Sequence, residues 1–91
     1  EVPATFGLKQ NYPNPFNPTT QIKYDIAKAS YVAIKVFDVL GNEVATVFNG
    51  NLAAGKYSAD FNASNLSTGI YFYSLSVDGQ KIDTKKMILV K

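Results

Sequence analysis

Residues 66–77 read Leu66-Ser67-Thr68-Gly69-Ile70-Tyr71-Phe72-Tyr73-Ser74-Leu75-Ser76-Val77, and this stretch decides the fold. Four of its residues, Tyr71, Tyr73, Leu75 and Val77, alternate with Ile70, Phe72, Ser74 and Ser76. A period of two is typical of a β-strand, because successive side chains point to opposite faces. The face with the tyrosines is apolar throughout, whereas the other face turns polar after Phe72. We therefore expect the tyrosine face to meet the core.

The same stretch carries a second signal at its start. Leu66-x-x-Gly69-x-Tyr71 resembles the tyrosine corner of immunoglobulin-like sandwiches, in which the Tyr hydroxyl bonds to backbone a few residues upstream. No long segment has apolar residues at helical spacing, and about seven segments alternate like strands between turn signals. The sequence therefore predicts an all-β fold, an immunoglobulin-like seven-stranded antiparallel β-sandwich, with this stretch as its central strand.

The other strands are expected on both sides of this stretch. They are Phe6–Tyr12, Thr20–Ile26, Tyr31–Val39, Glu43–Phe48, Lys56–Phe61 and Gln80–Val90. Asp78-Gly79 is a strong signal for a two-residue hairpin turn, and Leu40-Gly41-Asn42 is expected to form another tight turn. Asn49-Gly50-Asn51 is expected to belong to a surface connection. Inward-facing side chains are predicted at Ile22, Tyr24, Ile26, Val32, Ile34, Val36, Tyr57, Ala59 and Phe61.

The most unusual composition lies between the first two expected strands, at Asn11–Thr20. Three prolines within six residues remove three backbone donors, so neither a helix nor a central strand is available there. We expect a stiff, ordered loop with Tyr12 and Phe16 as apolar anchors. The residues alone leave two interpretations open, a rigid crossover between strands and a recognition loop.

Composition excludes several classes of function. The 91 residues are enough for one domain, and they include neither His nor Cys, so Ser-His and Cys-His nucleophile systems cannot be assembled within the chain. All nine basic residues are Lys, and the lack of Arg makes a nucleic-acid partner improbable. Asp38, Asn42 and Glu43 could offer oxygen ligands to Ca²⁺, but they match no calcium loop, and turn chemistry explains them. We therefore expect no catalytic residue, no metal and no cofactor.

Four separated blocks of the sequence resemble one protein family. They are NYPNPFNPTTQIKYDI (11–26), VAIKVFDVLGNEVATV (32–47), GKYSADFNASNLSTGIYFYSL (55–75) and KKMILVK (85–91). Their kind and order are similar to the type A C-terminal sorting domain of type IX secretion cargo from the Bacteroidota and their relatives. The resemblance extends from about Phe6 to Lys91. It implies an immunoglobulin-like, non-catalytic domain appended to a secreted enzyme or adhesin.

The resemblance also implies which residues form the sorting signal. Pro13, Asn14 and Pro15 match an early proline motif, and Gly69, Ile70 and Tyr71 match a late glycine-aromatic motif. The terminal motif matches Lys86 through Lys91, in which we single out Lys86, Val90 and Lys91.

The family resemblance implies an export route as well. The outer-membrane translocation machinery recognises such a domain in the periplasm, and the cargo becomes secreted or surface-bound. A surface sortase then usually removes the domain and often attaches the cargo to lipopolysaccharide. Residues 1–5 would be the linker to the upstream cargo domain, with cleavage near or before Glu1–Thr5, and residues 6–91 the sorting domain. We therefore expect the chain to be a piece of a longer protein.

A receptor could recognise the last strand by hydrogen-bonding to its backbone. An edge strand offers unpaired N–H and C=O groups, so we predict that a partner pairs with Lys85–Lys91, with the proline loop shaping the same end. The isolated domain could also dimerise through such an edge. The lysines Lys81, Lys85, Lys86 and Lys91 serve either as edge protection or as a contact with an anionic receptor.

Two other functions stay open at this point. One is an accessory carbohydrate-binding or fibronectin-like module of a secreted glycoside hydrolase, which would need an aromatic platform or a groove, and Phe37 and Phe72 are candidate aromatics. The other is a passive spacer that resembles the immunoglobulin-like part of flagellar hook-capping proteins.

Overall fold

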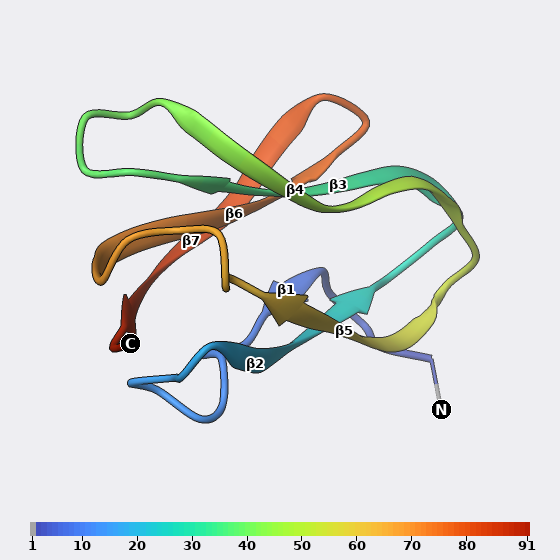
Figure 1. The fold of residues 1–91 in the computed structure, drawn as a ribbon. Helices are drawn as coiled ribbons and strands as arrows, with labels where there is room; N and C mark the ends of the chain where they lie inside the picture. The colour runs from blue at the N-terminus through green and yellow to red at the C-terminus, as the bar shows by residue number, and fades with distance from the viewer. Residues whose placement is uncertain (1) are drawn as a thin grey trace.

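Two antiparallel β-sheets packed face to face make up the molecule (Figure 1). The computed structural model describes residues 2–91. The strands are β1 (Gly7–Leu8), β2 (Thr19–Ile26), β3 (Ser30–Phe37), β4 (Glu43–Leu52), β5 (Gly55–Asn62), β6 (Gly69–Val77) and β7 (Gln80–Leu89). One sheet has the order β1-β2-β5 and the other β4-β3-β6-β7. The all-β prediction is confirmed.

The described part of the chain holds only strands, turns and irregular segments. Within it there is accordingly no helix that is long and apolar enough to span a membrane.

The core lies between the two sheets and follows the alternation of the strands. On β6 the four residues of the tyrosine face are all buried, as predicted, and β6 lies between β3 and β7. The predicted inward residues of β2 and β3 are also buried, because each is two residues from the next along its strand. The buried apolar residues are Leu8, Phe16, Ile22, Tyr24, Ile26, Val32, Ile34, Val36, Phe61, Ala63, Tyr71, Tyr73, Leu75, Val77, Met87 and Leu89.

Both predicted tight turns are present. Asp78 and Gly79 have φ of 51° and 84°, the left-handed backbone that a two-residue hairpin needs to match the twist of its strands. At the β3–β4 turn, Gly41 has φ of 88°. The Asp38 carboxylate accepts hydrogen bonds from the N–H groups of Leu40 and Asn42, each at 2.9 Å, and so holds that turn.

Three local predictions differ from the structure. Asn49-Gly50-Asn51 lies within β4 rather than in a connection, because β3 offers it a continuous partner: Val32 pairs with Gly50. Partner strands thus override the local turn preference. The first strand is only Gly7–Leu8, followed by an isolated bridge between Tyr12 and Gln21. Tyr12 is also not an anchor, since it is 81% exposed.

The chain enters and leaves the sandwich at opposite ends (Figure 1). The molecule measures 36 × 24 × 17 Å, and the first described residues lie far from the C-terminus along its long direction. The loop that joins β1 to β2 lies at the C-terminal end. Of the predicted linker, Glu1 lies outside the described residues, and residues 2–5 form no strand.

Candidate functional site

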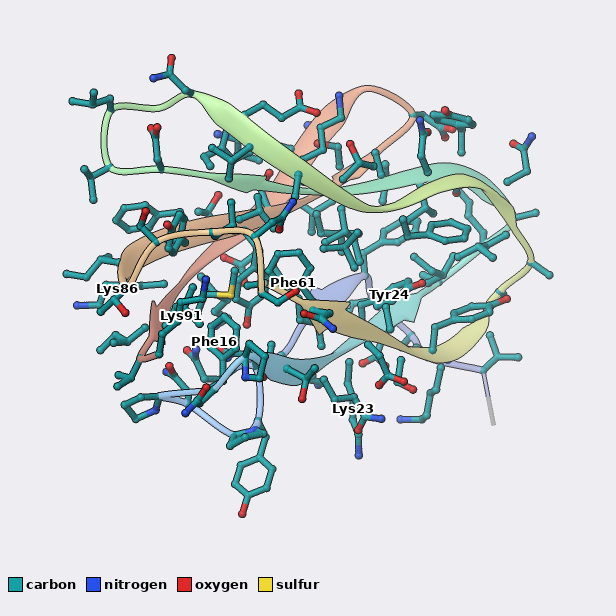
Figure 2. The ribbon with its side chains drawn as sticks, in the orientation of Figure 1. Phe16, Lys23, Tyr24, Phe61, Lys86 and Lys91 are labelled. Atoms are coloured by element: carbon teal, nitrogen blue, oxygen red, sulfur yellow. The ribbon has the colours of Figure 1, made fainter. Side chains whose placement is uncertain are left out.

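The proline loop, residues 11–18, is held by one buried apolar residue and one buried polar network. Phe16 is 1% exposed, and its ring lies 6.3 Å from that of Phe61 between centroids (Figure 2). The buried Asn11 side chain donates to Thr20 Oγ1 at 3.0 Å and to the carbonyl oxygen of Pro13 at 3.2 Å. Thr20 Oγ1 also donates to that carbonyl, at 2.9 Å. The stiff, ordered loop and the Phe16 anchor are therefore confirmed.

This loop runs along the outer edge of the final strand. Phe16 forms a parallel bridge with Leu89, in which the Phe16 N–H donates to the carbonyl of Ile88 and the Val90 N–H donates to the carbonyl of Phe16, both at 2.9 Å. The side chain of Asn14 accepts the N–H of Ile88 at 3.0 Å. Pro15 and Pro18 lack an N–H, whereas Phe16 keeps both of its backbone groups and uses both in this bridge.

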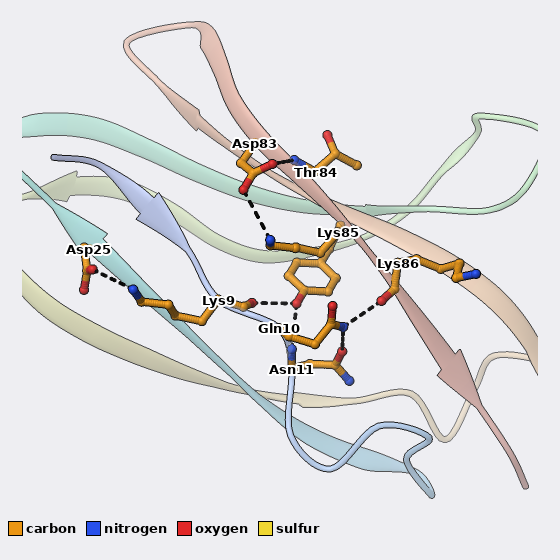
Figure 3. Close-up of polar contacts among 9 residues, drawn as sticks. Lys9, Gln10, Asn11, Asp25, Asp83, Thr84, Lys85 and Lys86 are labelled. Carbon is orange, nitrogen blue, oxygen red and sulfur yellow. Dashed lines mark hydrogen bonds and ion pairs between the residues drawn. The ribbon is translucent and has the colours of Figure 1, made fainter.

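A further side chain extends the covered edge toward the start of the strand. Gln10 Nε2 donates to the carbonyl oxygen of Lys86 at 2.7 Å and to the Asn11 side-chain oxygen at 2.7 Å (Figure 3). The Lys86 carbonyl, both backbone groups of Ile88 and the Val90 N–H are thus bonded to the segment 10–16.

These contacts correct one prediction. The last strand lies at the edge of its sheet, as expected, but Lys85–Lys91 does not offer a row of unpaired backbone groups to a partner. The proline loop occupies that edge from within the chain. Within residues 2–91, no strand pairs with the outer side of residues 80–84. That part of the edge is irregular, with a register shift opposite Leu75 and Ser76, a common protection of open edges.

The glycine-aromatic motif lies directly beside the terminal motif. Gly69, Ile70 and Tyr71 pair with Leu89, Ile88 and Met87. The Tyr71 hydroxyl donates to the carbonyl of Ser67 at 2.6 Å, which confirms the predicted tyrosine corner.

Lys91 is hydrogen-bonded to the loop between β5 and β6, in which the Ser67 carbonyl accepts the Tyr71 hydroxyl. Its backbone N–H donates to Thr68 Oγ1 at 3.0 Å, and its ammonium group donates to the carbonyl of Ser64. The structure therefore brings the three sequence motifs together at one end of the sandwich, where Figure 2 shows Phe16, Lys86 and Lys91 close to one another.

Sequence reasoning missed one residue of this arrangement. The Tyr73 hydroxyl accepts the N–H of Asn11 and donates to the carbonyl of Lys9, each at 2.7 Å (Figure 3). Burial raises the pKa of Tyr73 to about 12. The available signal was chemical: a Tyr predicted to face the core needs a partner for its hydroxyl.

Charge at this end is positive. Among residues 2–91 the ion pairs are Lys9–Asp25 at 3.3 Å, Lys35–Glu43 at 3.5 Å and Lys85–Asp83 at 3.7 Å. Neither Lys86 nor Lys91 takes part in one.

The acidic turn has a structural role. Asp38 binds the backbone of its own turn, and the N–H of Asn42 is the main cause that lowers the pKa of its carboxyl. Among residues 2–91, no group of three or more His, Cys, Asp or Glu side chains is arranged to hold a metal ion.

Two sheets with a tyrosine corner define an immunoglobulin-like sandwich domain, and three sequence motifs meet at one end of it. The family model of the secretion system C-terminal sorting domain matches residues 10–91. The chain belongs to this family, whose members are non-catalytic sorting signals of type IX secretion. The domain directs export across the outer membrane to the cell surface or the medium. No curated protein matches the chain.

Three solved structures contain a part with the same fold. Dimeric latent PorU from Porphyromonas gingivalis matches with a TM-score of 0.75 and 18% identity, over 89% of this chain and 9% of that one. A β-glucosidase from Listeria innocua in complex with glucose matches with a TM-score of 0.57 and 13% identity, over 93% of this chain and 16% of that one. The alkylpurine DNA glycosylase AlkC from Pseudomonas fluorescens, bound to DNA with an abasic site analogue, matches with a TM-score of 0.51 and 10% identity. The match covers 92% of this chain and 30% of that one. At these identities the likeness concerns the fold alone, and the chain spans less than a third of each protein.

Proposed function

We propose that the translocation machinery of type IX secretion reads the end of the sandwich at which the three motifs meet. The observation that carries this proposal is the convergence of residues distant in sequence: Asn14 bonds Ile88, and Ile88 pairs with Ile70. If one recognition surface is built from three motifs, all three are required in one folded domain. A linear tail would need only the last of them.

The position of the linker fits the same function. The first described residues lie at the opposite end, so a cargo domain attached through residues 1–5 would leave the motif end uncovered. Residues 6–91 then act as the sorting domain. After transport, a surface sortase cuts the exposed linker and transfers the cargo to lipopolysaccharide. Val2 is 63% exposed, as such a cut requires of the chain near it.

Truncation in a reporter fusion tests the proposal. A reporter that carries the whole chain is expected on the cell surface, and one that lacks Lys86–Lys91 is expected in the periplasm. Because that deletion also removes four of the ten residues of β7, a second variant is needed that spares the fold. Lys86→Ala with Lys91→Ala removes two ammonium groups and no buried apolar surface, and it should reduce display while the fusion keeps its melting temperature.

A control at the other end and a binding assay complete the test. Ala53→Ser with Ala54→Ser, in the β4–β5 connection, should leave display unchanged. Normal display after loss of Lys86–Lys91 would refute the sorting function. Retention of the fusion on insoluble polysaccharide, with display independent of the motifs, would favour the carbohydrate-binding module instead.

A further inference from the structure

The outer face of the four-stranded sheet carries an apolar row at the motif end. Ile70 pairs with Ile88, Phe72 lies two residues further on β6, and Phe72 pairs with Phe37. All four side chains point away from the core, since their neighbours along each strand are the buried ones. Ile70 is 43% exposed and the other three are half-buried. No third layer covers this face in residues 2–91.

Positive charge borders this apolar row. Lys86 pairs with Phe72 across β6 and β7, and Lys81 lies on the same face opposite Ser76. Neither lysine has an ion-pair partner among the described residues, whereas the nearby Lys35 is paired with Glu43. Asp38 also borders this face, and its carboxylate accepts two N–H groups of its own turn. The row therefore lies beside two lysines that form no ion pair among residues 2–91.

The row ends in a hollow beneath the β3–β4 turn. A groove of about 310 Å³ is lined by Phe37, Phe72, Val39, Lys81 and Thr84, with other residues of the turn. Val39 is 65% exposed at its rim. A flat apolar row that leads into a groove can take an inserted side chain from a partner, which is the arrangement that concentrates binding energy.

Backbone pairing is not available at this end while the proline loop covers the edge. Along the covered part of β7, recognition of the closed domain therefore relies on side chains. We propose that the apolar row of Ile88, Ile70, Phe72 and Phe37 is the docking surface for a protein partner that presents an apolar ridge flanked by carboxylates. The proposal rests on the sorting function, because it names the chemistry of the partner that reads the motif end. Ile70 and Lys86 link the row to two of the motifs.

The docking surface can be tested with two substitutions. One places a negative charge in the apolar row, and the other places the same charge elsewhere on the outer face of the sheet. Ile70→Glu in the reporter fusion should lower surface display at least tenfold, because the carboxylate must be desolvated against an apolar, acidic partner. Asn51→Glu is the matched control: it is exposed on β4 opposite Tyr31, on the same sheet but outside the row and away from Lys81 and Lys86. It should leave display within twofold of the parent. Both purified fusions should melt within a few degrees of the parent.

A second pair of variants tests the sign of the partner's charge. Lys86→Glu should reduce display more than Lys86→Gln, because only the former adds repulsion. Equal loss in the two variants would overturn the acidic character of the partner. Display of Ile70→Glu at the parent level would overturn the docking surface, and if loss of Lys86–Lys91 still blocks export, the sorting function itself stands. Loss of display in Asn51→Glu as well would also overturn the surface.

Two other occupants are distinguishable outcomes. Light scattering of the purified fusion should give a monomer; a dimer that Ile70→Glu dissociates would mean that a second copy covers the row, against the proposal. Co-sedimentation with phosphatidylglycerol vesicles should be absent; binding abolished by Ile70→Glu would assign the row to a lipid surface instead.

Discussion

The hydroxyl of Tyr73, on β6 of the four-stranded sheet, accepts the backbone N–H of Asn11, 62 residues away, at 2.7 Å. The same hydroxyl donates to the carbonyl of Lys9 at 2.7 Å. The side chain is 0% exposed, so water cannot replace it at either group. This one group ties the segment that leads into the proline loop to the central strand of the opposite sheet, and it fixes where the loop begins to follow β7.

Removal of that hydroxyl should lower the free energy of unfolding without opening a large cavity in the core. Tyr73→Phe keeps the ring but leaves two backbone groups without their partner, and we expect the free energy of unfolding to fall by about 1–3 kcal/mol. Chemical denaturation measures it. Tyr31→Phe is the control, because its exposed hydroxyl bonds only the Asn49 side chain at the surface and should cost less than about 0.5 kcal/mol. Equal effects of the two changes would show that the Tyr73 contacts contribute nothing.

The same residue should give the protein a stability loss in alkali. Burial raises the pKa of Tyr73 to about 12, against about 10 in an unfolded chain, so the folded state holds the proton more tightly. Its contribution is complete below pH 10 and is lost as the pH rises through 12. This difference in pKa corresponds to roughly 2–3 kcal/mol. The pKa of Tyr24 is also raised by burial, so the test compares unfolding of the parent and Tyr73→Phe between pH 9 and 12. Parallel curves would contradict the prediction.

Features set by neighbouring residues were predictable from the sequence. Alternation in residues 69–77 predicted a strand and its buried face, and Asp78-Gly79 predicted a hairpin with positive φ. The tyrosine corner depends on a hydroxyl and a carbonyl only four residues apart, so its spacing was visible as well. In each case a short-range rule determines the geometry.

Features that depend on distant partners were predicted poorly. The hydrogen bond between Ile88 and Asn14 spans 74 residues, and the sequence around each residue does not predict it. The family resemblance placed the two motifs at one end, but the residues alone suggested an open edge there. Aromatic character predicts that both Tyr12 and Phe16 anchor the loop, yet of the two only Phe16 is buried. In both cases the outcome depends on a contact with a residue that is distant in the sequence.

Hydrogen exchange can verify that the proline loop closes the edge of β7. An edge-strand amide that faced solvent would exchange quickly, whereas the amide of Ile88 is bonded to the Asn14 side chain and should be protected. Asn14→Ala should speed its exchange by about five- to tenfold, the equivalent of one net hydrogen bond. The amide of Val90, bonded to the Phe16 carbonyl, should change little.

Asn17→Ala is the control for this exchange experiment. Asn17 also precedes a proline and is exposed, but its side chain makes no hydrogen bond among residues 2–91. The Ile88 amide should then exchange as in the parent. Fast exchange of Ile88 in the unaltered protein would mean that the edge is open and that strand pairing with a partner is available after all.

The tyrosine corner should matter for stability rather than for contact with the machinery. Tyr71 is 8% exposed, so a partner cannot reach its ring, and its hydroxyl serves the Ser67 carbonyl. Tyr71→Phe should lower the free energy of unfolding by about 1 kcal/mol, while Tyr12→Phe, on an 81% exposed residue, should have no effect. Because the ring still fills the core, the Tyr71→Phe reporter should reach the surface. Loss of display with an unchanged melting temperature would instead make this hydroxyl part of what the machinery reads.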